Sequence, residues 1–471
     1  MNSADGDPVR PQPGPRRAGW RGLLALLSLS LALVIWFSGL IDSLQRPSVG
    51  DALGLSQLEL DAMVADWLPP GLRPALVGED PRGALRAELD RQLDQPATPP
   101  PVSLRLERAL LQAADGSDAP LRDLEATLEQ IDPQRRPLLR ALIDAEPLPA
   151  EQLATLLQPW GASPLLAQLS CERLGGRQDA CLERFGRPAE TLLRFLVVSV
   201  LPLPAVLVGV LLLVRQLWLW RRGRGPQAPP LLGPPLDGLD LVLLIAGGFV
   251  VLGEVIAPLV MVPLLERLLR HSSLSAPLRQ GLQVLGLYLG LAVAPLALLA
   301  WQLAGSAQLP PPQGWLQWRW RPWASAASSA LSHGLMVLPL VALASWLQEQ
   351  LVGDPGGSNP LLELVLTSGE PLALGCFALT AVVLAPLFEE TLFRGVLLPV
   401  VGRRLGGGPA VIISAAVFAL AHLSLGEFTP LLVLGLGLGW LRWRSGRLGP
   451  CVLLHSLWNG FTFANLIALG S

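Results

Sequence analysis

Residues 371–399 read PLALGCFALTAVVLAPLFEETLFRGVLLP. A helix needs roughly 20 mostly apolar residues to cross a bilayer, so this stretch predicts a transmembrane span. Three ionisable side chains interrupt it, Glu389, Glu390 and Arg394. Charged groups are unfavourable in hydrocarbon, and within a span they generally mark a functional site. The stretch therefore predicts a membrane protein with a polar site inside the bilayer.

Eight further apolar runs bring the number of predicted spans to about nine. They lie at residues 22–42, 191–215, 237–263, 281–304, 326–347, 409–425, 428–442 and 449–469. The composition agrees, because 51% of the residues are hydrophobic and only 15% are charged. A net charge of −2 gives no general attraction to nucleic acid. The sequence thus predicts an all-α polytopic membrane protein in contact with the lipid bilayer and not with nucleic acid.

The long interval between the first two spans, residues 43–189, predicts an inserted helical soluble domain. Leu and Ala recur there at three- and four-residue steps, as in residues 104–111, which is the period of an amphipathic helix. The interval also holds Cys171 and Cys181, the only cysteines outside the predicted spans. They predict a local disulfide if the domain faces an oxidising compartment, and two free thiols otherwise.

The remaining segments follow from the spans. We predict a basic cytoplasmic tail at residues 1–21, a transmembrane anchor at 22–42, transmembrane helices at 190–367 and a catalytic transmembrane core at 368–471. An uncleaved anchor is favoured over a signal peptide because the first apolar run is long and no small-residue cleavage site follows it.

The distribution of arginine gives an orientation, since the chain has no lysine. Arginines gather before the first span and in alternate loops, at Arg221–Arg224, Arg319–Arg321, Arg403–Arg404 and Arg442–Arg447. The positive-inside rule places these loops and the N-terminus in the cytoplasm, and residues 43–189 outside it. The basic loop at 267–279 falls on the outer side as an exception. The other outer loops carry the acidic residues Asp354, Glu363, Glu370 and Glu427.

The two glutamates of the sixth span have different expected roles. Glu390 and Arg394 are four residues apart with the acid first, the favourable order for an ion pair on a helix. We expect them to support the site by neutralising charge. Glu389 points about 100° away and needs a partner on another helix. A poorly solvated carboxylate takes up a proton near neutral pH, as a general base requires. The alternative is a structural ion-pair network.

His422 is the first candidate partner of Glu389. It ends the sequence FALAH at residues 418–422. At 1.5 Å per residue, Glu389 lies ~21 Å from Arg403 and His422 lies ~20 Å from Pro409, so both reach a similar depth from the cytoplasmic face. We expect the two side chains to share one water molecule. The alternative is a histidine that only hydrogen-bonds a neighbouring helix.

His455 and Asn459 are one helical turn apart and share a face. Counted from Pro450 they lie shallower, at ~8 and ~14 Å. Both can donate hydrogen bonds to an oxyanion, or they can bridge helices. Before them, Gly435 and Gly439 form a small-xxx-small face for close helix packing. The same run lacks the preceding strand that a dinucleotide-binding loop requires.

Together the three motifs resemble the CPBP family, which comprises the type II CAAX prenyl endopeptidases, the bacterial Abi proteins and the bacteriocin-processing or immunity proteins. The family pattern is Glu-Glu-x-x-x-Arg, then Phe-x-x-x-His, then His-x-x-x-Asn or a similar ending. This sequence matches all three in order. The resemblance covers the predicted catalytic core and none of the chain before it.

The resemblance implies an intramembrane endopeptidase, a hydrolase with a helical-bundle fold. It assigns roles to six residues: Glu389 and His422 would activate water, His455 and Asn459 would bind the oxyanion, and Glu390 and Arg394 would support the site. A metal-free, glutamate-dependent mechanism without a cofactor is preferred. If a metal is present, its ligands would be Glu389, His422 and His455, although the chain has no His-Glu-x-x-His pair of a standard zinc site.

The expected substrate is a membrane-embedded or membrane-associated protein or peptide, and nothing in the sequence indicates that it is prenylated. The all-arginine composition and the inserted domain suggest a bacterial relative in the cytoplasmic membrane.

Two other functions fit the fold less well. A catalytically silent scaffold or bacteriocin-immunity-type protein would be expected to lose motif residues, and none is lost here. A proton-coupled transporter would show symmetry between its halves, whereas the polar residues crowd into the last four predicted spans.

Overall fold

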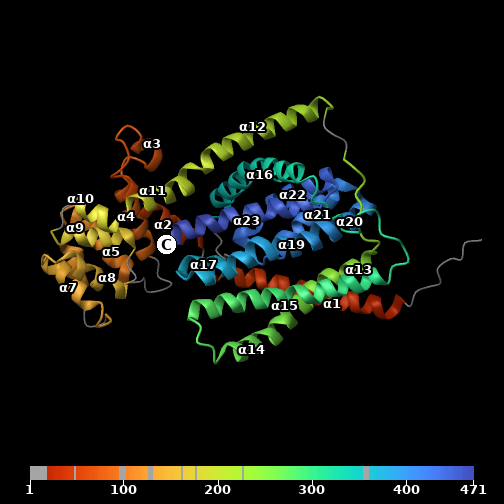
Figure 1. Cartoon of the computed structure of the whole chain (residues 1–471), viewed down its shortest axis with the longest axis horizontal. Coiled ribbons are helices and arrows are strands. Elements are labelled where there is room, and N and C mark those ends of the chain that lie inside the picture. The colour runs from red at the N-terminus through yellow and green to blue at the C-terminus, as the bar shows by residue number, and fades with distance from the viewer. Residues whose placement is uncertain are drawn as a thin grey trace, which may run out of the picture. The chain divides into compact units, whose positions relative to one another are not determined.

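The computed structural model of the chain describes residues 18–46, 49–94, 102–125, 131–160, 163–175, 178–224, 228–353 and 360–470. Every regular element in these ranges is helical, which confirms the predicted all-α fold (Figure 1). Most of the predicted basic tail, residues 1–17, and the loop residue Asp354 lie outside the described residues.

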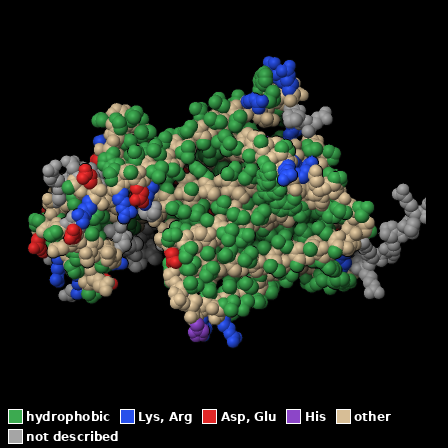
Figure 2. Space-filling view, viewed as in Figure 1, with side chains coloured by type: hydrophobic (Ala, Val, Ile, Leu, Met, Phe, Trp, Pro, Cys, Tyr) green, Lys and Arg blue, Asp and Glu red, His purple; other side chains and the backbone are tan. Residues whose placement is uncertain are grey.

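Seven helical stretches among the described residues are long and apolar enough to cross a membrane, which supports an integral membrane protein. They are Gly19–Ser43, Pro188–Arg221, Gly238–Leu269, Ala276–Ala304, Trp323–Val352, Pro371–Leu405 and Gly449–Gly470. Figure 2 shows hydrophobic side chains over most of the visible surface of these helices, as contact with lipid requires.

The other two predicted spans are helices that do not meet these limits. α21 (Gly407–Leu420) has 14 residues, which is short for a full crossing. α22 (Leu425–Ser445) has 21 residues but carries Glu427, Arg442 and Arg444. Among the described residues, all nine predicted spans are thus wholly or largely helical, and seven of them are long and apolar enough to cross a membrane; the number of nine spans is not confirmed.

The helices fall into two compact units. Unit 1 comprises residues 1–47, 209–359 and 368–460, and unit 2 comprises residues 48–208, 360–367 and 461–471. The helices of unit 1 are α1 (Ala18–Ser43), α13 (Gly238–Val242), η4 (Leu243–Ile256), α14 (Ala257–Leu269), α15 (Ala276–Ala304), α16 (Trp323–Val352), α18 (Pro371–Ala378), η5 (Leu379–Leu384), α19 (Ala385–Glu390), η6 (Thr391–Leu397), α20 (Leu398–Leu405), α21 and α22. α12 (Pro202–Arg221) and α23 (Gly449–Gly470) have residues in both units.

Three of the six residues of the candidate site, Glu389, Glu390 and Arg394, lie on one continuous helical stretch from Pro371 to Leu405. Its segments η5 and η6 are π-helical, and α19 lies between them. A π-helical turn widens the helix and shifts the side chains that follow it, and such turns frequently occur at functional sites. Glu389 and Glu390 end α19, directly before the second of these segments.

Two glycines set the packing of α22 against α21. A Cβ atom added to Gly435 would lie 3.0 Å from the Cα atom of Ala415, and one added to Gly439 would lie 3.1 Å from Val411 Cγ1. The predicted small-xxx-small face therefore brings these two helices into close contact. The carbonyl group of Gly435 can then reach the interior of the bundle.

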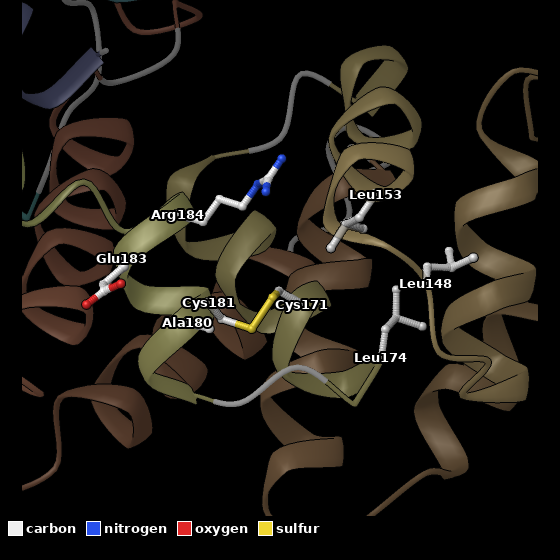
Figure 3. Close-up of a pocket in the computed structure, with 8 residues that line it drawn as sticks. All are labelled: Leu148, Leu153, Cys171, Leu174, Ala180, Cys181, Glu183 and Arg184. Atoms are coloured by element: carbon white, nitrogen blue, oxygen red, sulfur yellow. A yellow bond between two sulfur atoms is a disulfide. The ribbon is translucent and has the colours of Figure 1, made fainter.

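Unit 2 is built from short helices around a leucine-rich core. They are α2 (Val49–Val64), α3 (Arg73–Val77), α4 (Pro81–Leu93), α5 (Val102–Ala114), α6 (Ala119–Glu125), α7 (Arg136–Asp144), α8 (Ala150–Leu157), η2 (Gln158–Trp160), α9 (Pro164–Arg173), α10 (Gln178–Phe185), α11 (Pro188–Phe195), η3 (Leu196–Val200) and α17 (Pro360–Thr367). Cys171 and Cys181 form a disulfide that joins α9 to α10. Figure 3 shows this bond beside Leu174 in the wall of a surface pocket. Of the two predicted states of these cysteines, the structure contains the disulfide.

Unit 2 also contains one buried and one half-buried acidic side chain, Glu107 and Glu59. Glu107 of α5 is 2% exposed, and Glu59 of α2 is hydrogen-bonded to Ser163. Burial raises the pKa of Glu59 to about 7. Burial, together with the charge of Glu59, raises the pKa of Glu107 well above its usual range. These carboxyl groups therefore take up protons more readily than carboxyl groups in water do.

Candidate functional site

Glu390 and Arg394 form a fully buried ion pair, as their spacing predicts. Arg394 Nη1 lies 2.9 Å from Glu390 Oε1, and both side chains are 0% exposed. Arg394 also donates from Nη2 to the Gly435 carbonyl at 3.2 Å, and its guanidinium lies 4.3 Å from the ring centroid of Phe418. A buried charge pair is stable only with such good geometry and additional partners. The pair is therefore a fixed structural element within the bundle.

His455 is held by the same carboxylate. Its Nδ1 atom lies 3.0 Å from Glu390 Oε1, and its side chain is 3% exposed. An ionised carboxylate only accepts hydrogen bonds, so Nδ1 carries the proton and donates it. The imidazole is thereby fixed in orientation, and its Nε2 atom points away from Glu390. This arrangement, a carboxylate that orients an imidazole, is typical of acid–base catalysis.

The Nε2 atom of His455 faces Glu389. It lies 3.9 Å from Glu389 Oε2, a buried oxygen that has no hydrogen-bond partner within the described residues. The other oxygen, Oε1, accepts a hydrogen bond from the hydroxyl group of Tyr288 at 3.2 Å. The Glu389 side chain is 16% exposed, in contrast to the fully buried Glu390. One oxygen of Glu389 is thus positioned by a neutral donor while the other is free.

His422 lies just beyond the last turn of α21 and packs against the ring of Phe418. Its Nδ1 atom donates to the Phe418 carbonyl at 2.8 Å, which leaves Nε2 free. The Phe418 ring packs edge-on against both histidines, with centroid distances of 4.8 Å to His422 and 5.7 Å to His455. Within the described part of the chain, no hydrogen bond or ion pair joins His422 to Glu389. Equal depth along two helices does not determine which side chains face each other, and here His455 is the histidine that faces Glu389.

Asn459 connects α23 to the π-helical segment η5. Its Nδ2 atom donates to the Ala381 carbonyl at 2.8 Å. An amide nitrogen carries two hydrogens, so one of them remains for another acceptor. The role predicted for Asn459 in binding an oxyanion needs only that second hydrogen.

The sequence analysis missed Tyr288. It lies on α15, 101 residues before Glu389, and has no motif around it. The available signal was composition, because Tyr288 is the only tyrosine in the chain and falls within a predicted span.

The donors of the site do not form a complete metal site. Among the described residues there is no group of three or more His, Cys, Asp or Glu side chains that could hold an ion. Only Glu389 Oε2 and His455 Nε2 converge, whereas catalytic zinc generally takes three protein ligands. The residues present therefore do not fit the metal ligand set Glu389, His422 and His455.

Comparison with known families agrees with this part of the molecule. Residues 371–461 match the family model described as type II CAAX prenyl endopeptidase Rce1-like, which confirms the resemblance to the CPBP family. The match includes all six predicted site residues and supports a membrane peptidase similar to CAAX proteases. Tyr288 lies outside it. Residues 50–190 match a second model, described as a domain of unknown function (DUF8675). No curated protein and no solved structure matches the chain.

Proposed function

We propose that the protein is an intramembrane endopeptidase in which Glu389 activates a water molecule for attack on a peptide bond. The observation that carries this proposal is the unpaired, buried Glu389 Oε2 atom, 3.9 Å from His455 Nε2. This separation is too long for a direct hydrogen bond. A water molecule beside the two atoms could donate one hydrogen to each of them and direct its lone pair at a substrate.

The proposed reaction is a general-base hydrolysis. As the water oxygen attacks the carbonyl carbon, one water proton passes to Glu389 and the hydroxide adds to the carbon. The resulting tetrahedral oxyanion collapses, the C–N bond breaks, and the proton on Glu389 passes to the leaving nitrogen. The products are one carboxyl-terminal and one amino-terminal fragment, and Glu389 returns to its starting state.

The remaining side chains have supporting tasks in this proposal. Glu390, neutralised by Arg394, keeps the proton of His455 on Nδ1, so that Nε2 accepts from the water. Asn459 offers its second amide hydrogen to the oxyanion. The role predicted for His422 in water activation stays a prediction.

The substrate class follows from the location of the site. A site on membrane-spanning helices is reached by proteins or peptides that are themselves inserted in or anchored to the bilayer. We therefore propose a membrane-associated protein substrate, with prenylated and unmodified chains both to be tested. The proposed orientation, with residues 43–189 outside the cytoplasm, leaves unit 2 free to bind the extracytoplasmic part of such a substrate.

The deciding experiment compares wild type with Glu389→Gln, which keeps the shape and removes the base. Membrane proteomes of cells that contain either form are compared for an uncut precursor, and the purified proteins are then assayed with that precursor in liposomes. We expect a loss of cleavage of at least about 100-fold. Glu254→Gln is the matched control, because Glu254 is a carboxylate of another span that is hydrogen-bonded to Trp36. Equal cleavage by wild type and Glu389→Gln would reject the proposal.

A further inference from the structure

A separate cavity lies between four helices of unit 1. Its volume is about 750 Å³, and its walls come from α12, α16, α21 and α22. None of the six predicted site residues lines it. The volume lies within the usual range of sites for small ligands, about 300–1,000 Å³. The cavity is therefore large enough for a ligand and is distinct from the site around Glu389.

The shape of the cavity follows from how α12 crosses α16. The two helices touch where Gly209 faces Leu335, because a Cβ atom on Gly209 would lie 2.0 Å from the Leu335 carbonyl oxygen. Figure 1 shows α12 diverging from α16 beyond this crossing. The diverging part of α12 lines the cavity from Leu213 to Trp220. Along α22 the lining runs from Val433 to Arg444.

The cavity has the length of one bilayer leaflet. The eleven residue steps from Val433 to Arg444 correspond to about 16 Å of helix at 1.5 Å per residue. Half of the ~30 Å hydrocarbon core is about 15 Å. The Arg444 end also carries Trp220, Trp440 and Trp443, and tryptophan gathers at the level of the lipid headgroups.

Among the described residues that line the cavity, Arg444 is the only Arg, Asp or Glu. It is half-buried and lies 5.5 Å from the ring centroid of Trp440. Within the described residues it forms no ion pair with a carboxylate. Trp220 is followed by Arg221, the last residue of α12, and by Arg222. On the visible face, Figure 2 shows basic and no acidic side chains around this end. This end of the cavity therefore suits an anionic group.

We propose that the cavity binds one anionic phospholipid, with an acyl chain between α12, α16 and α22 and its phosphate on Arg444. Basic pockets between transmembrane helices are known to select such headgroups. This proposal concerns lipid binding and does not depend on the proposed peptidase activity.

The test is lipid titration of the purified full-length protein in detergent, followed by native mass spectrometry. Phosphatidylglycerol and phosphatidylcholine with the same acyl chains are compared. We expect wild type to bind one phosphatidylglycerol in preference to phosphatidylcholine. Arg444→Gln should weaken the binding of phosphatidylglycerol about fivefold and that of phosphatidylcholine, whose headgroup has no net charge, by less. The control is Arg404→Gln, since Arg404 is an exposed arginine of α20 outside the cavity, and it should have no effect.

Variants that fill the cavity test whether an acyl chain occupies it. Leu340→Trp and Leu436→Trp each add bulk to the lining from a different helix, so one informative variant remains if the other fails to fold. Each variant should weaken the binding of both lipids. Equal binding of the two lipids by wild type, or equal losses in Arg444→Gln and Arg404→Gln, would overturn the proposal. So would unchanged binding in a folded tryptophan variant, or displacement of the lipid by a prenylated peptide, which would assign the cavity to substrate.

Discussion

Replacement of Glu390 by Gln should destabilise the protein strongly although the shape of the side chain hardly changes. The substitution leaves the Arg394 guanidinium 0% exposed and without a counter-charge. Loss of one partner of a buried ion pair generally lowers the free energy of unfolding by about 3–5 kcal/mol. In this variant Arg394 keeps its hydrogen bond to the Gly435 carbonyl and its contact with the face of the Phe418 ring, and the oxygen of the new glutamine still accepts one hydrogen bond. We therefore expect the lower end, about 3 kcal/mol, which is about a 100-fold change in the unfolding equilibrium.

The double variant Glu390→Gln/Arg394→Met separates charge burial from all other effects. Buried pairs that are replaced together by uncharged groups of similar volume are often neutral for stability. We expect the free energy of unfolding of the double variant to lie within about 1 kcal/mol of the wild-type value. Cleavage should stay reduced at least about 100-fold in both variants, because His455 loses the carboxylate that fixes its Nδ1 proton.

The assay is equilibrium unfolding in mixed detergent micelles, followed by far-ultraviolet circular dichroism, with cleavage measured on the same preparations. If the free energy of unfolding of Glu390→Gln lies within about 1 kcal/mol of the wild-type value, the Glu390–Arg394 pair behaves like a solvent-exposed one. The burial of the pair seen here would then be wrong. If the double variant is no more stable than the single one, the unpaired charge is not the cause of the loss.

Four further outcomes are expected. Tyr288→Phe should lower kcat about tenfold with little change in melting temperature, since it removes one hydrogen bond to a charged group; an unchanged kcat would show that this bond does not position the base. Because burial raises the pKa of Glu59 to about 7 and that of Glu107 well above its usual range, folded unit 2 binds more protons than its unfolded chain. The contribution of these two groups to the stability of unit 2 should be greatest below about pH 4.5 and should fall as the pH rises through about 7. Hydrogen exchange of the full-length protein at several pH values measures this stability. Glu59→Gln should make it depend less on pH. Replacement of both disulfide cysteines by serine should destabilise unit 2 by about 3 kcal/mol, for a loop of sequence separation 10; limited proteolysis would show no difference if the bond is dispensable. Dialysis against a chelator should leave cleavage unchanged, and a loss that added zinc restores would contradict the metal-free mechanism.

The features that the sequence predicts correctly are those set by neighbours on one helix. The Glu390–Arg394 pair needs only a four-residue spacing, and the contact of Gly435 with α21 needs only a face of small residues. Span positions are equally local, because an apolar run is read directly from composition. The two helices that fall short of these limits, α21 and α22, correspond to the two shortest runs in the prediction, residues 409–425 and 428–442.

The contacts that define the site are tertiary and could not be read in this way. His455 lies 65 residues from Glu390, and Tyr288 lies 101 residues from Glu389. The distance along each helix from its cytoplasmic end gave His422 as the partner of Glu389 and put His455 at a shallower level. In the structure, His455 Nε2 lies 3.9 Å from Glu389 Oε2. That estimate ignores helix rotation and tilt, and it cannot include the π-helical turns on both sides of α19.

The two adjacent glutamates show why a motif alone does not assign roles. They are chemically identical, yet they differ in donors and in exposure. Glu390 accepts hydrogen bonds at Oε1 from Arg394 and His455 and is 0% exposed, whereas Glu389 accepts one from the Tyr288 hydroxyl and is 16% exposed. Glu390 therefore holds Arg394 and His455 in place, while the more exposed Glu389 is left to interact with water. Residues from α15, α22 and α23 create this difference, so the division of labour between the two glutamates depends on the fold and not on the motif itself.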